Sequence, residues 1–248
     1  MPLIWMHGML GSVESDTIYS LVDLQLLSGQ VKLIRYDVCD QSADGDYSWP
    51  AMTDELTKIA DSLDSSAIML GGISMGSGTA LFTALRNPEK VKALILVTPP
   101  PAWEVRRAVQ DLYEKIAKRA RPDRLPEFLK RLIQLNPDPP AFFEKQFPGT
   151  REKLLDHRQS FNPAYYYSIY HGGAISDFPE REQLTNLSVP CLIVADPHDP
   201  NHPVEVACEM HSLIRNSELH FVSGFNDYLE LQEKVHEFVK KHQSNYES

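Results

Sequence analysis

The 248-residue sequence is poor in the residues that would define several other protein classes. It has only three cysteines, Cys39, Cys191 and Cys208, which lie far apart and form no CxxC or Cys/His pattern. Neither a disulfide framework nor a zinc site is therefore expected, and reduced thiols fit a cytoplasmic protein. There is also no GxGxxG after a strand and no P-loop, so we expect no cofactor and no metal.

Long apolar runs and an excess of positive charge are absent too. No stretch approaches the roughly 18 uncharged apolar residues that span a bilayer, and the first residues lack the basic and apolar regions of a secretory signal. Lys and Arg number 24 against 34 Asp and Glu, a formal net charge of −10. We therefore expect neither nucleic acid nor a membrane as partner. Nothing in the sequence indicates the oligomeric state.

Short apolar segments alternate with amphipathic ones along most of the chain. This alternation is typical of a parallel sheet that helices cover on both faces. We predict an α/β fold with a mostly parallel sheet of about six strands. The expected strands are residues 3–6, 31–36, 67–70, 91–97, 191–195 and 219–222, and the expected helices are residues 18–27, 52–63, 75–86, 204–214 and 228–240.

One long interval, from residue 99 to about 189, contains no convincing strand and is interrupted by many prolines. An insertion after the carboxyl end of a strand usually lies over the functional site. We therefore predict a core domain of residues 1–100 and 187–248, with a helical cap, or lid, over residues 101–186. Residues 101–160 hold 13 Lys and Arg against 9 Asp and Glu, a local charge of +4. The basic residues include Arg106, Arg107, Lys115, Lys118, Arg119, Arg121 and Arg124. Such a cap could attract anionic substrates, or it could present only a solvated helix face.

The most informative segment is Gly72-Ile73-Ser74-Met75-Gly76, a GxSxG between an expected strand and an expected helix. A serine on such a tight turn is held in a strained conformation with its hydroxyl exposed, and the turn leaves no room for side chains at the flanking glycines. The pattern predicts a nucleophilic serine at position 74. The alternative is a glycine-rich turn that contains a serine by chance.

On this segment and its surroundings the sequence resembles the α/β-hydrolase superfamily over nearly its whole length. In that family the loop after the first strand, here His7-Gly8-Met9, completes an oxyanion hole, so the resemblance implies backbone N–H donors at Met9 and Met75. The long insertion corresponds to the family's cap. The catalytic acid follows the strand at residues 191–195; Asp199 fits the usual spacing better than Asp196.

Two departures from the family pattern stand out. The antiparallel strands that usually precede the oxyanion strand are not part of this sequence, so the sheet should be trimmed at one edge. The family also has a histidine just after the last strand, and the glycine at position 224 aligns Phe225 with that histidine. Phenylalanine cannot accept a proton, and a serine without a nearby base is a weak nucleophile.

Other histidines could replace the missing base. His202 lies three residues after Asp199 in a loop at the active edge, and we favour it as the base with Asp199 as its partner. His171, late in the cap and followed by two glycines, is the second candidate. His198 shares the loop with His202 as a further alternative. It is also open that none of them reaches Ser74.

The function that the sequence favours is hydrolysis of a small ester, thioester or lactone by a carboxylesterase-like serine hydrolase. An alternative is a non-hydrolytic small-ligand-binding protein or inactive homologue, since the fold alone does not specify activity. A third is a cofactor-free lyase or dioxygenase. The substrate is expected to be a small molecule, anionic or aromatic among the options, with Trp103 and Phe225 near the pocket.

Overall fold

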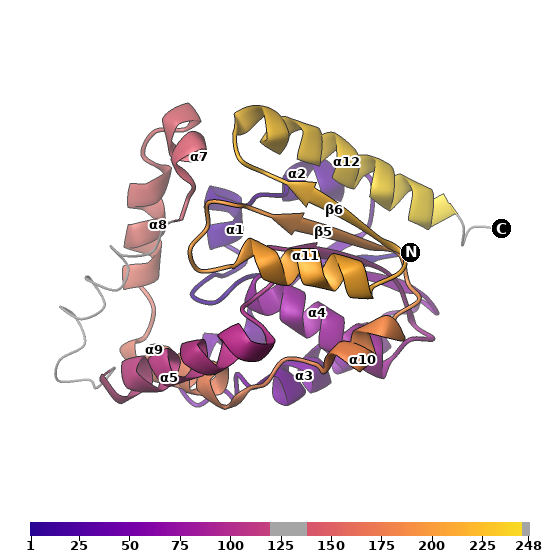
Figure 1. The fold of residues 1–248 in the computed structure, drawn as a ribbon. Helices are drawn as coiled ribbons and strands as arrows, with labels where there is room; N and C mark the ends of the chain where they lie inside the picture. Colours follow the sequence, from indigo (N-terminus) through magenta and orange to yellow (C-terminus); the bar gives the residue numbers. More distant parts are fainter. Residues whose placement is uncertain (120–137, 245–248) are drawn as a thin grey trace.

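The centre of the molecule is a six-stranded sheet, seen in a computed structural model that describes residues 1–119 and 138–244. Every neighbouring pair of strands in it is parallel. The predicted α/β fold is therefore confirmed (Figure 1). The order is β2-β1-β3-β4-β5-β6, with strands β1 (Leu3–Met6), β2 (Leu33–Arg35), β3 (Ile68–Ile73), β4 (Val91–Val97), β5 (Cys191–Ala195) and β6 (Ser217–Phe221).

Helices cover both faces of this sheet, as parallel crossover connections require (Figure 1). One face carries α1 (Ser15–Ile18), α2 (Leu24–Ser28) and α12 (Phe225–Ser244). The other carries α3 (Trp49–Ser62), α4 (Met75–Arg86) and α11 (Val204–Leu213). The remaining described helices are the 3-10 helix η1 (Val38–Gln41), α5 (Trp103–Arg119), α7 (Ala141–Gln146), α8 (Thr150–Gln159), α9 (Pro163–Ile175) and α10 (Arg181–Thr185).

Side-chain alternation along β1 shows how the two cores form. All four residues of the strand are buried. Leu3 and Trp5 point into the core beneath α2 and α12, whereas Ile4 and Met6 point into the core beneath α3 and α4. Successive side chains on a strand face opposite sides, so a strand buried on both faces reads as a continuous apolar run.

Local structure differs from the sequence prediction at several places, and the ends of β2, α3 and β6 are shifted by one to three residues. The single helix expected over residues 18–27 is two short helices, because the Asp23 carboxylate caps α2 by accepting hydrogen bonds from the N–H groups of Gln25 (2.9 Å) and Leu26 (3.1 Å). Strand β3 continues to Ile73, which brings its carboxyl end directly to the serine turn. The last helix begins at Phe225 and not three residues later.

The segment between β4 and β5 supplies helices α5 and α7 to α9, which lie beyond the carboxyl ends of the strands (Figure 1). Helices α5 and α9 pack against each other. Helix α8 contacts the start of the chain, where His157 Nε2 and Ser12 Oγ lie 2.7 Å apart. Helix α10 instead packs beside α11. In the part of the chain that the structure describes, no helix combines the length and apolar character needed to cross a bilayer.

Candidate active site

Ser74 occupies the turn between β3 and α4 in a conformation that few serines adopt. Its φ of 52° and ψ of −112° place it outside the helix and strand regions. Its backbone N–H donates to the Val97 carbonyl (2.9 Å), and its own carbonyl accepts from Gly78 N–H (3.0 Å). The strained residue is thus held by β4 on one side and by the first turn of α4 on the other.

The two glycines of the GxSxG are required by close backbone contacts. A Cβ atom on Gly72 would lie 2.6 Å from the carbonyl carbon of Gly76, and one on Gly76 would overlap the carbonyl oxygens of Met6 and His7. The turn therefore packs directly on the end of β1. This contact presents Ser74 beside the loop that follows β1: a Cβ on Gly8 would be 3.5 Å from Ser74 Cβ.

His202 and Asp199 lie next to Ser74, although they are 128 and 125 residues away along the chain. His202 Nε2 is 2.7 Å from Ser74 Oγ, and His202 Nδ1 is 2.6 Å from Asp199 Oδ2. Both side chains are largely buried, with 18% of the His202 and 13% of the Asp199 side chain exposed. Because a carboxylate can only accept here, the proton of a neutral His202 lies on Nδ1, and Nε2 is free to accept the serine proton.

The two carboxylates in the loop after β5 are in different electrostatic situations. Burial raises the pKa of Asp199, but the hydrogen bond and charge of His202 and two backbone N–H groups outweigh it and leave the pKa below its usual value. Burial raises the pKa of Asp196, which accepts from His198 N–H (2.8 Å) and not from the His202 ring. Of the two carboxylates, only Asp199 is therefore placed to act as the charged partner of His202.

The other histidine candidates lie elsewhere. His171 is exposed, and its ring stacks on Tyr167 with the ring centroids 5.6 Å apart. His198 is also exposed. Among the described residues, His202 is the histidine that hydrogen-bonds to Ser74.

The loop after β1 is braced by a buried imidazole. His7 Nδ1 donates to the Gly8 carbonyl (2.8 Å), and His7 Nε2 accepts from Val38 N–H (3.1 Å). Burial lowers the pKa of His7, in keeping with a neutral ring that donates once and accepts once. In the described part of the chain no group accepts from Met9 N–H, and Met75 is the first residue of α4, whose N–H has no intrahelical acceptor. Two backbone donors are thus available near Ser74: Met9 N–H in the loop after β1 and Met75 N–H in the residue that follows the serine.

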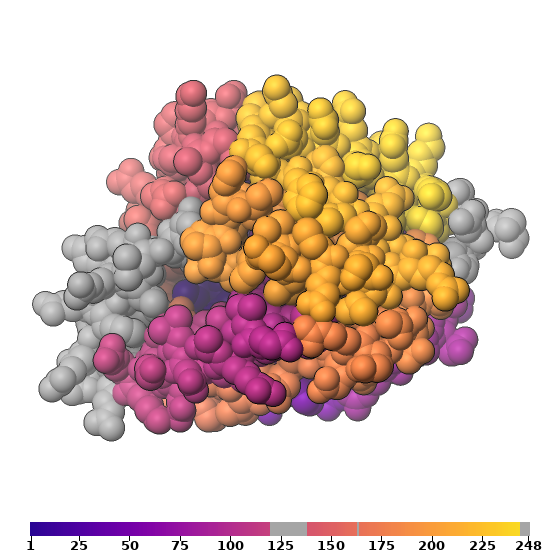
Figure 2. Space-filling view, in the orientation of Figure 1, coloured from indigo at the N-terminus to yellow at the C-terminus, as the bar shows by residue number. Residues whose placement is uncertain are grey.

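A narrow cavity opens onto Ser74 between the sheet edge and helices α5 and α9. The space that the centre of a water molecule can occupy in this cavity is about 20 Å³, which is enough for one or two waters. Figure 2 shows a hollow beside α5 with N-terminal residues, in indigo, at its floor. The residues that line the cavity are Met9, Tyr47, Trp49, Met52, Ser74, Met75, Pro100, Arg106, Tyr113, Ile169, Gly173 and Ser176.

Neither Trp103 nor Phe225, expected at the pocket, lines this cavity. The Trp103 indole N–H donates to the Pro179 carbonyl (3.0 Å), so the side chain anchors the start of α5 to the segment before α10. The Phe225 ring stacks on Tyr228 of its own helix, with the ring centroids 5.6 Å apart, and packs edge-on against Phe147, with the centroids 6.0 Å apart. The position that the family pattern assigns to the histidine thus serves packing between α12 and the segment after α7.

Several lining residues carried no signal that the sequence analysis could use. Tyr47, Trp49 and Met52 come from the segment around the start of α3, and Tyr113 and Ile169 come from α5 and α9. Arg106 was only one of many basic residues in the segment of residues 101–160. These side chains meet because their helices cross above the strand ends, which no local pattern records.

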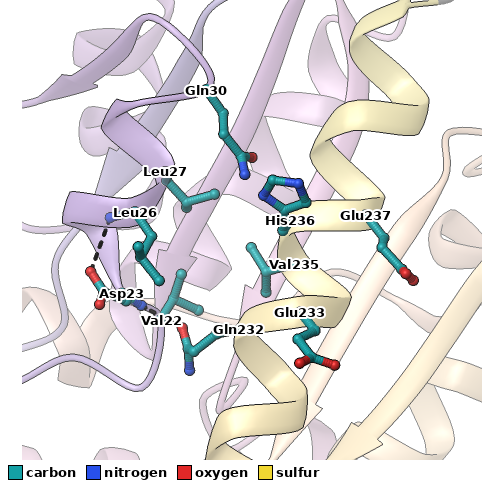
Figure 3. Close-up of a pocket in the computed structure, with 10 residues that line it drawn as sticks. All are labelled: Val22, Asp23, Leu26, Leu27, Gln30, Gln232, Glu233, Val235, His236 and Glu237. Atoms are coloured by element: carbon teal, nitrogen blue, oxygen red, sulfur yellow. Dashed lines mark hydrogen bonds between the residues drawn. The ribbon is translucent and has the colours of Figure 1, made fainter.

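A larger hollow of about 420 Å³ lies between α2 and α12 (Figure 3). Two of its polar side chains have structural roles: Asp23 caps α2, and Gln232 accepts from Asp23 N–H (2.7 Å) and donates to the Leu21 carbonyl (2.9 Å). It contains no serine or cysteine nucleophile. Within the described ranges no group of His, Cys, Asp and Glu is arranged to hold a metal ion.

A parallel sheet between two helix layers, with a serine on a strand-to-helix turn at its carboxyl edge, defines the class of α/β hydrolase folds. The chain belongs to the alpha/beta hydrolase fold family, whose model matches residues 2–229. A curated relative, the AB hydrolase superfamily protein YisY of Bacillus subtilis (strain 168), is 28% identical over 222 residues, which cover 84% of this chain and 78% of YisY.

Solved structures agree on the fold. A thermophilic esterase from Thermogutta terrifontis matches with a TM-score of 0.80 and 21% identity, covering 98% of this chain and 90% of that chain. MenH from S. aureus matches with a TM-score of 0.78 and 21% identity, covering 98% of this chain and 94% of that chain. At these identities the likeness concerns the fold alone.

Proposed function

We propose that the protein is a serine hydrolase that cleaves small esters, thioesters or lactones. Ser74 is the nucleophile, His202 the general base and acid, and Asp199 the residue that orients and stabilises His202. The observation that carries the proposal is the continuous chain of contacts from Asp199 Oδ2 to His202 (2.6 Å) and from His202 Nε2 to Ser74 Oγ (2.7 Å).

The first half-reaction transfers the acyl group to the enzyme. Ser74 Oγ attacks the carbonyl carbon while its proton moves to His202 Nε2, and the resulting imidazolium is stabilised by the Asp199 carboxylate 2.6 Å away. The negative charge that develops on the carbonyl oxygen is received by the backbone N–H groups of Met9 and Met75. The intermediate collapses when His202 gives its proton to the leaving alcohol or thiol.

The second half-reaction reverses these roles with water as the nucleophile. Water gives its proton to His202 Nε2 and attacks the acyl carbon, and Ser74 leaves as its oxygen recovers that proton. The strained turn supports both steps, because the start of α4 directs N–H groups toward the developing charge.

The segment of residues 101–186 would act as the cap over this reaction. It supplies α5 and α9, whose residues Arg106, Tyr113, Ile169 and Gly173 line the cavity. Because the cavity holds little more than one or two water molecules, a substrate enters only when these helices move apart.

The decisive test is active-site labelling and turnover with matched serine variants. A fluorophosphonate should label the wild-type protein and the Ser77→Ala variant, but not Ser74→Ala. Ser77 is a suitable control because it lies on the same turn of α4 and donates to the Ser74 carbonyl (2.7 Å). Hydrolysis of p-nitrophenyl esters should follow the same pattern. Labelling and turnover that persist in Ser74→Ala would refute the proposal, and their absence from the wild-type protein would favour a ligand-binding role.

A further inference from the structure

Arg106 is a buried cation in the wall of the cavity that contains Ser74. It is 4% exposed, and in the described part of the chain no carboxylate forms an ion pair with it. Asp177 attracts it from farther away, but the Asp177 carboxylate is exposed and accepts from Gln110 (2.9 Å). A buried charge without a carboxylate partner is costly, and a carboxylate of a bound ligand would offset that cost.

The guanidinium is held in place but its hydrogen bonds are incomplete. Nε donates to the Ser176 carbonyl (3.0 Å), and Nη2 donates to the Gly173 carbonyl (2.6 Å). The group lies over the Trp49 ring, 4.5 Å from its centroid. No described residue accepts a hydrogen bond from Nη1, so this part of the fork is available to a ligand in the cavity.

A second polar group lies on the same wall. Tyr113 is seven residues after Arg106, two turns farther along α5, and its ring centroid is 5.9 Å from the guanidinium carbon. Its hydroxyl has no hydrogen-bond partner among the described residues, and burial raises its pKa, so it is a neutral donor. Its ring also lies close to the proposed oxyanion loop: a Cβ on Gly173 would be 2.9 Å from Tyr113 Cδ2 and 3.1 Å from Met9 Cε.

We propose that Arg106, assisted by Tyr113, binds a carboxylate group of the substrate, so that the enzyme acts on esters, thioesters or lactones that carry a free carboxylate. The proposal rests on the proposed function and specifies its substrate class. The remaining walls, which include Tyr47, Met52 and Ile169, are largely apolar, and this environment strengthens an Arg–carboxylate pair relative to water. A neutral substrate would leave the guanidinium buried and unpaired.

The test compares pairs of esters that differ mainly in charge. On the acyl side the pair is monomethyl succinate and methyl 4-methylpentanoate, followed by acid release; on the leaving-group side it is 4-acetoxybenzoate and phenyl acetate. The wild-type protein should show a kcat/KM for the charged member of one pair about 30-fold or more above that of its neutral partner. In Arg106→Met this ratio should fall to near one, and in Tyr113→Phe it should fall several-fold.

The matched control is Gln110→Ala. Gln110 Nε2 donates to the same Ser176 carbonyl as Arg106 (2.8 Å) but does not line the cavity, so this variant weakens the junction of α5 and the end of α9 without removing the cavity charge. Its ratio should equal that of the wild type. If Arg106→Met does not fold, the charged-to-neutral kcat/KM ratios of the wild type and of Tyr113→Phe still test the proposal. The proposal is overturned if neither pair shows a preference for the charged ester, or if the preference survives in Arg106→Met.

A binding measurement separates failure of this inference from failure of the hydrolase proposal. Monomethyl succinate should bind to Ser74→Ala with a Kd at least tenfold lower than to the Ser74→Ala/Arg106→Met double variant, as measured by calorimetry. That result needs no turnover and would stand even if Ser74 were not a nucleophile. Equal affinities would overturn carboxylate recognition by Arg106 while leaving the hydrolase proposal untouched.

Discussion

The contact between Asp199 and His202 offers the sharpest test of the proposed chemistry. Asp199→Asn preserves the shape of the side chain but removes the charge that would stabilise the imidazolium. The amide can also donate a hydrogen bond to His202 Nδ1, which would move the histidine proton to Nε2, the atom 2.7 Å from Ser74 Oγ. A ring in that tautomer cannot accept the serine proton.

The size of the effect follows from these two losses. A hydrogen bond to a charged group contributes about 1.5–3 kcal/mol, so loss of the charge alone should lower kcat by about 10- to 150-fold. The unfavourable tautomer adds to this, and the same substitution in a Ser-His-Asp protease lowers kcat by about 10⁴. We expect kcat for p-nitrophenyl acetate to fall by about 10²- to 10⁴-fold at pH 7, with a much smaller change in KM.

The stability of the same variant has a predictable pH dependence. The pKa of Asp199 lies below its usual value in the folded protein, so its ionised form stabilises the fold above the unfolded-state pKa, and that stabilisation is lost as the pH falls through the folded-state pKa. The difference in the free energy of unfolding between wild type and Asp199→Asn should therefore shrink from pH 7 to pH 3 in urea titrations.

Asp196→Asn is the matched control, because Asp196 lies in the same loop and accepts from His198 N–H, a bond that an amide oxygen can keep. We expect it to lower kcat less than tenfold. Equal losses of kcat in the two variants would show that turnover depends on the structure of the loop and not on the Asp199 charge. An Asp199→Asn protein within tenfold of wild type would refute the assigned role of this carboxylate.

Three further predictions concern the turn, a half-buried acid and the cavity. Gly76→Ala should destabilise the fold by about 3 kcal/mol and abolish turnover, because its Cβ overlaps two backbone carbonyl oxygens, whereas Gly224→Ala, with open space around it, should change the free energy of unfolding by less than about 0.5 kcal/mol. Burial raises the pKa of Asp16 to about 7. The stability contributed by its protonated form is therefore fully present below the unfolded-state pKa and is lost as the pH rises to about 7. The free energy of unfolding of Asp16→Asn should rise by about 2–4 kcal/mol relative to that of the wild type between pH 4 and pH 8, and a constant difference between the two proteins would contradict the raised pKa. The kcat/KM of p-nitrophenyl esters should fall steeply beyond short acyl chains, and Ile169→Ala, which removes a fully buried wall of the cavity, should extend the accepted length; a flat chain-length profile in the wild type would contradict the narrow cavity.

Much of the fold could be predicted from the sequence because it depends on short-range patterns. Strands β1, β4 and β5 begin and end where their apolar runs do, since a strand buried on both faces needs such a run. The prediction of one helix over residues 18–27 was wrong for a local reason. The Asp23 side chain accepts hydrogen bonds from the N–H groups of Gln25 and Leu26, so that a new helix begins at residue 24.

The segment of residues 101–186 was less predictable, because its helices are amphipathic and gain their positions only by packing. The sequence indicated Trp103 and Phe225 near the pocket. The structure places the Trp103 ring against Phe178, and its indole N–H donates to the Pro179 carbonyl. Which face of a helix lines a cavity depends on how it crosses its neighbour, and helix α5 turns Arg106 and Tyr113 inward instead.

For the site itself, the sequence alone determined the strand-to-helix turn at Ser74, since the apolar run, the glycines and the helix start are contiguous and the backbone overlaps allow few alternatives. It could also name His202, His171 and His198 as candidate bases. Only the tertiary structure decided which ring meets the serine, because the loop after β5 and the turn after β3 become neighbours through parallel strand pairing across β4. It likewise decided that a buried, unpaired Arg106 faces the same cavity, since its burial is produced by the packing of α5 on α9 and not by any residue beside it in the chain.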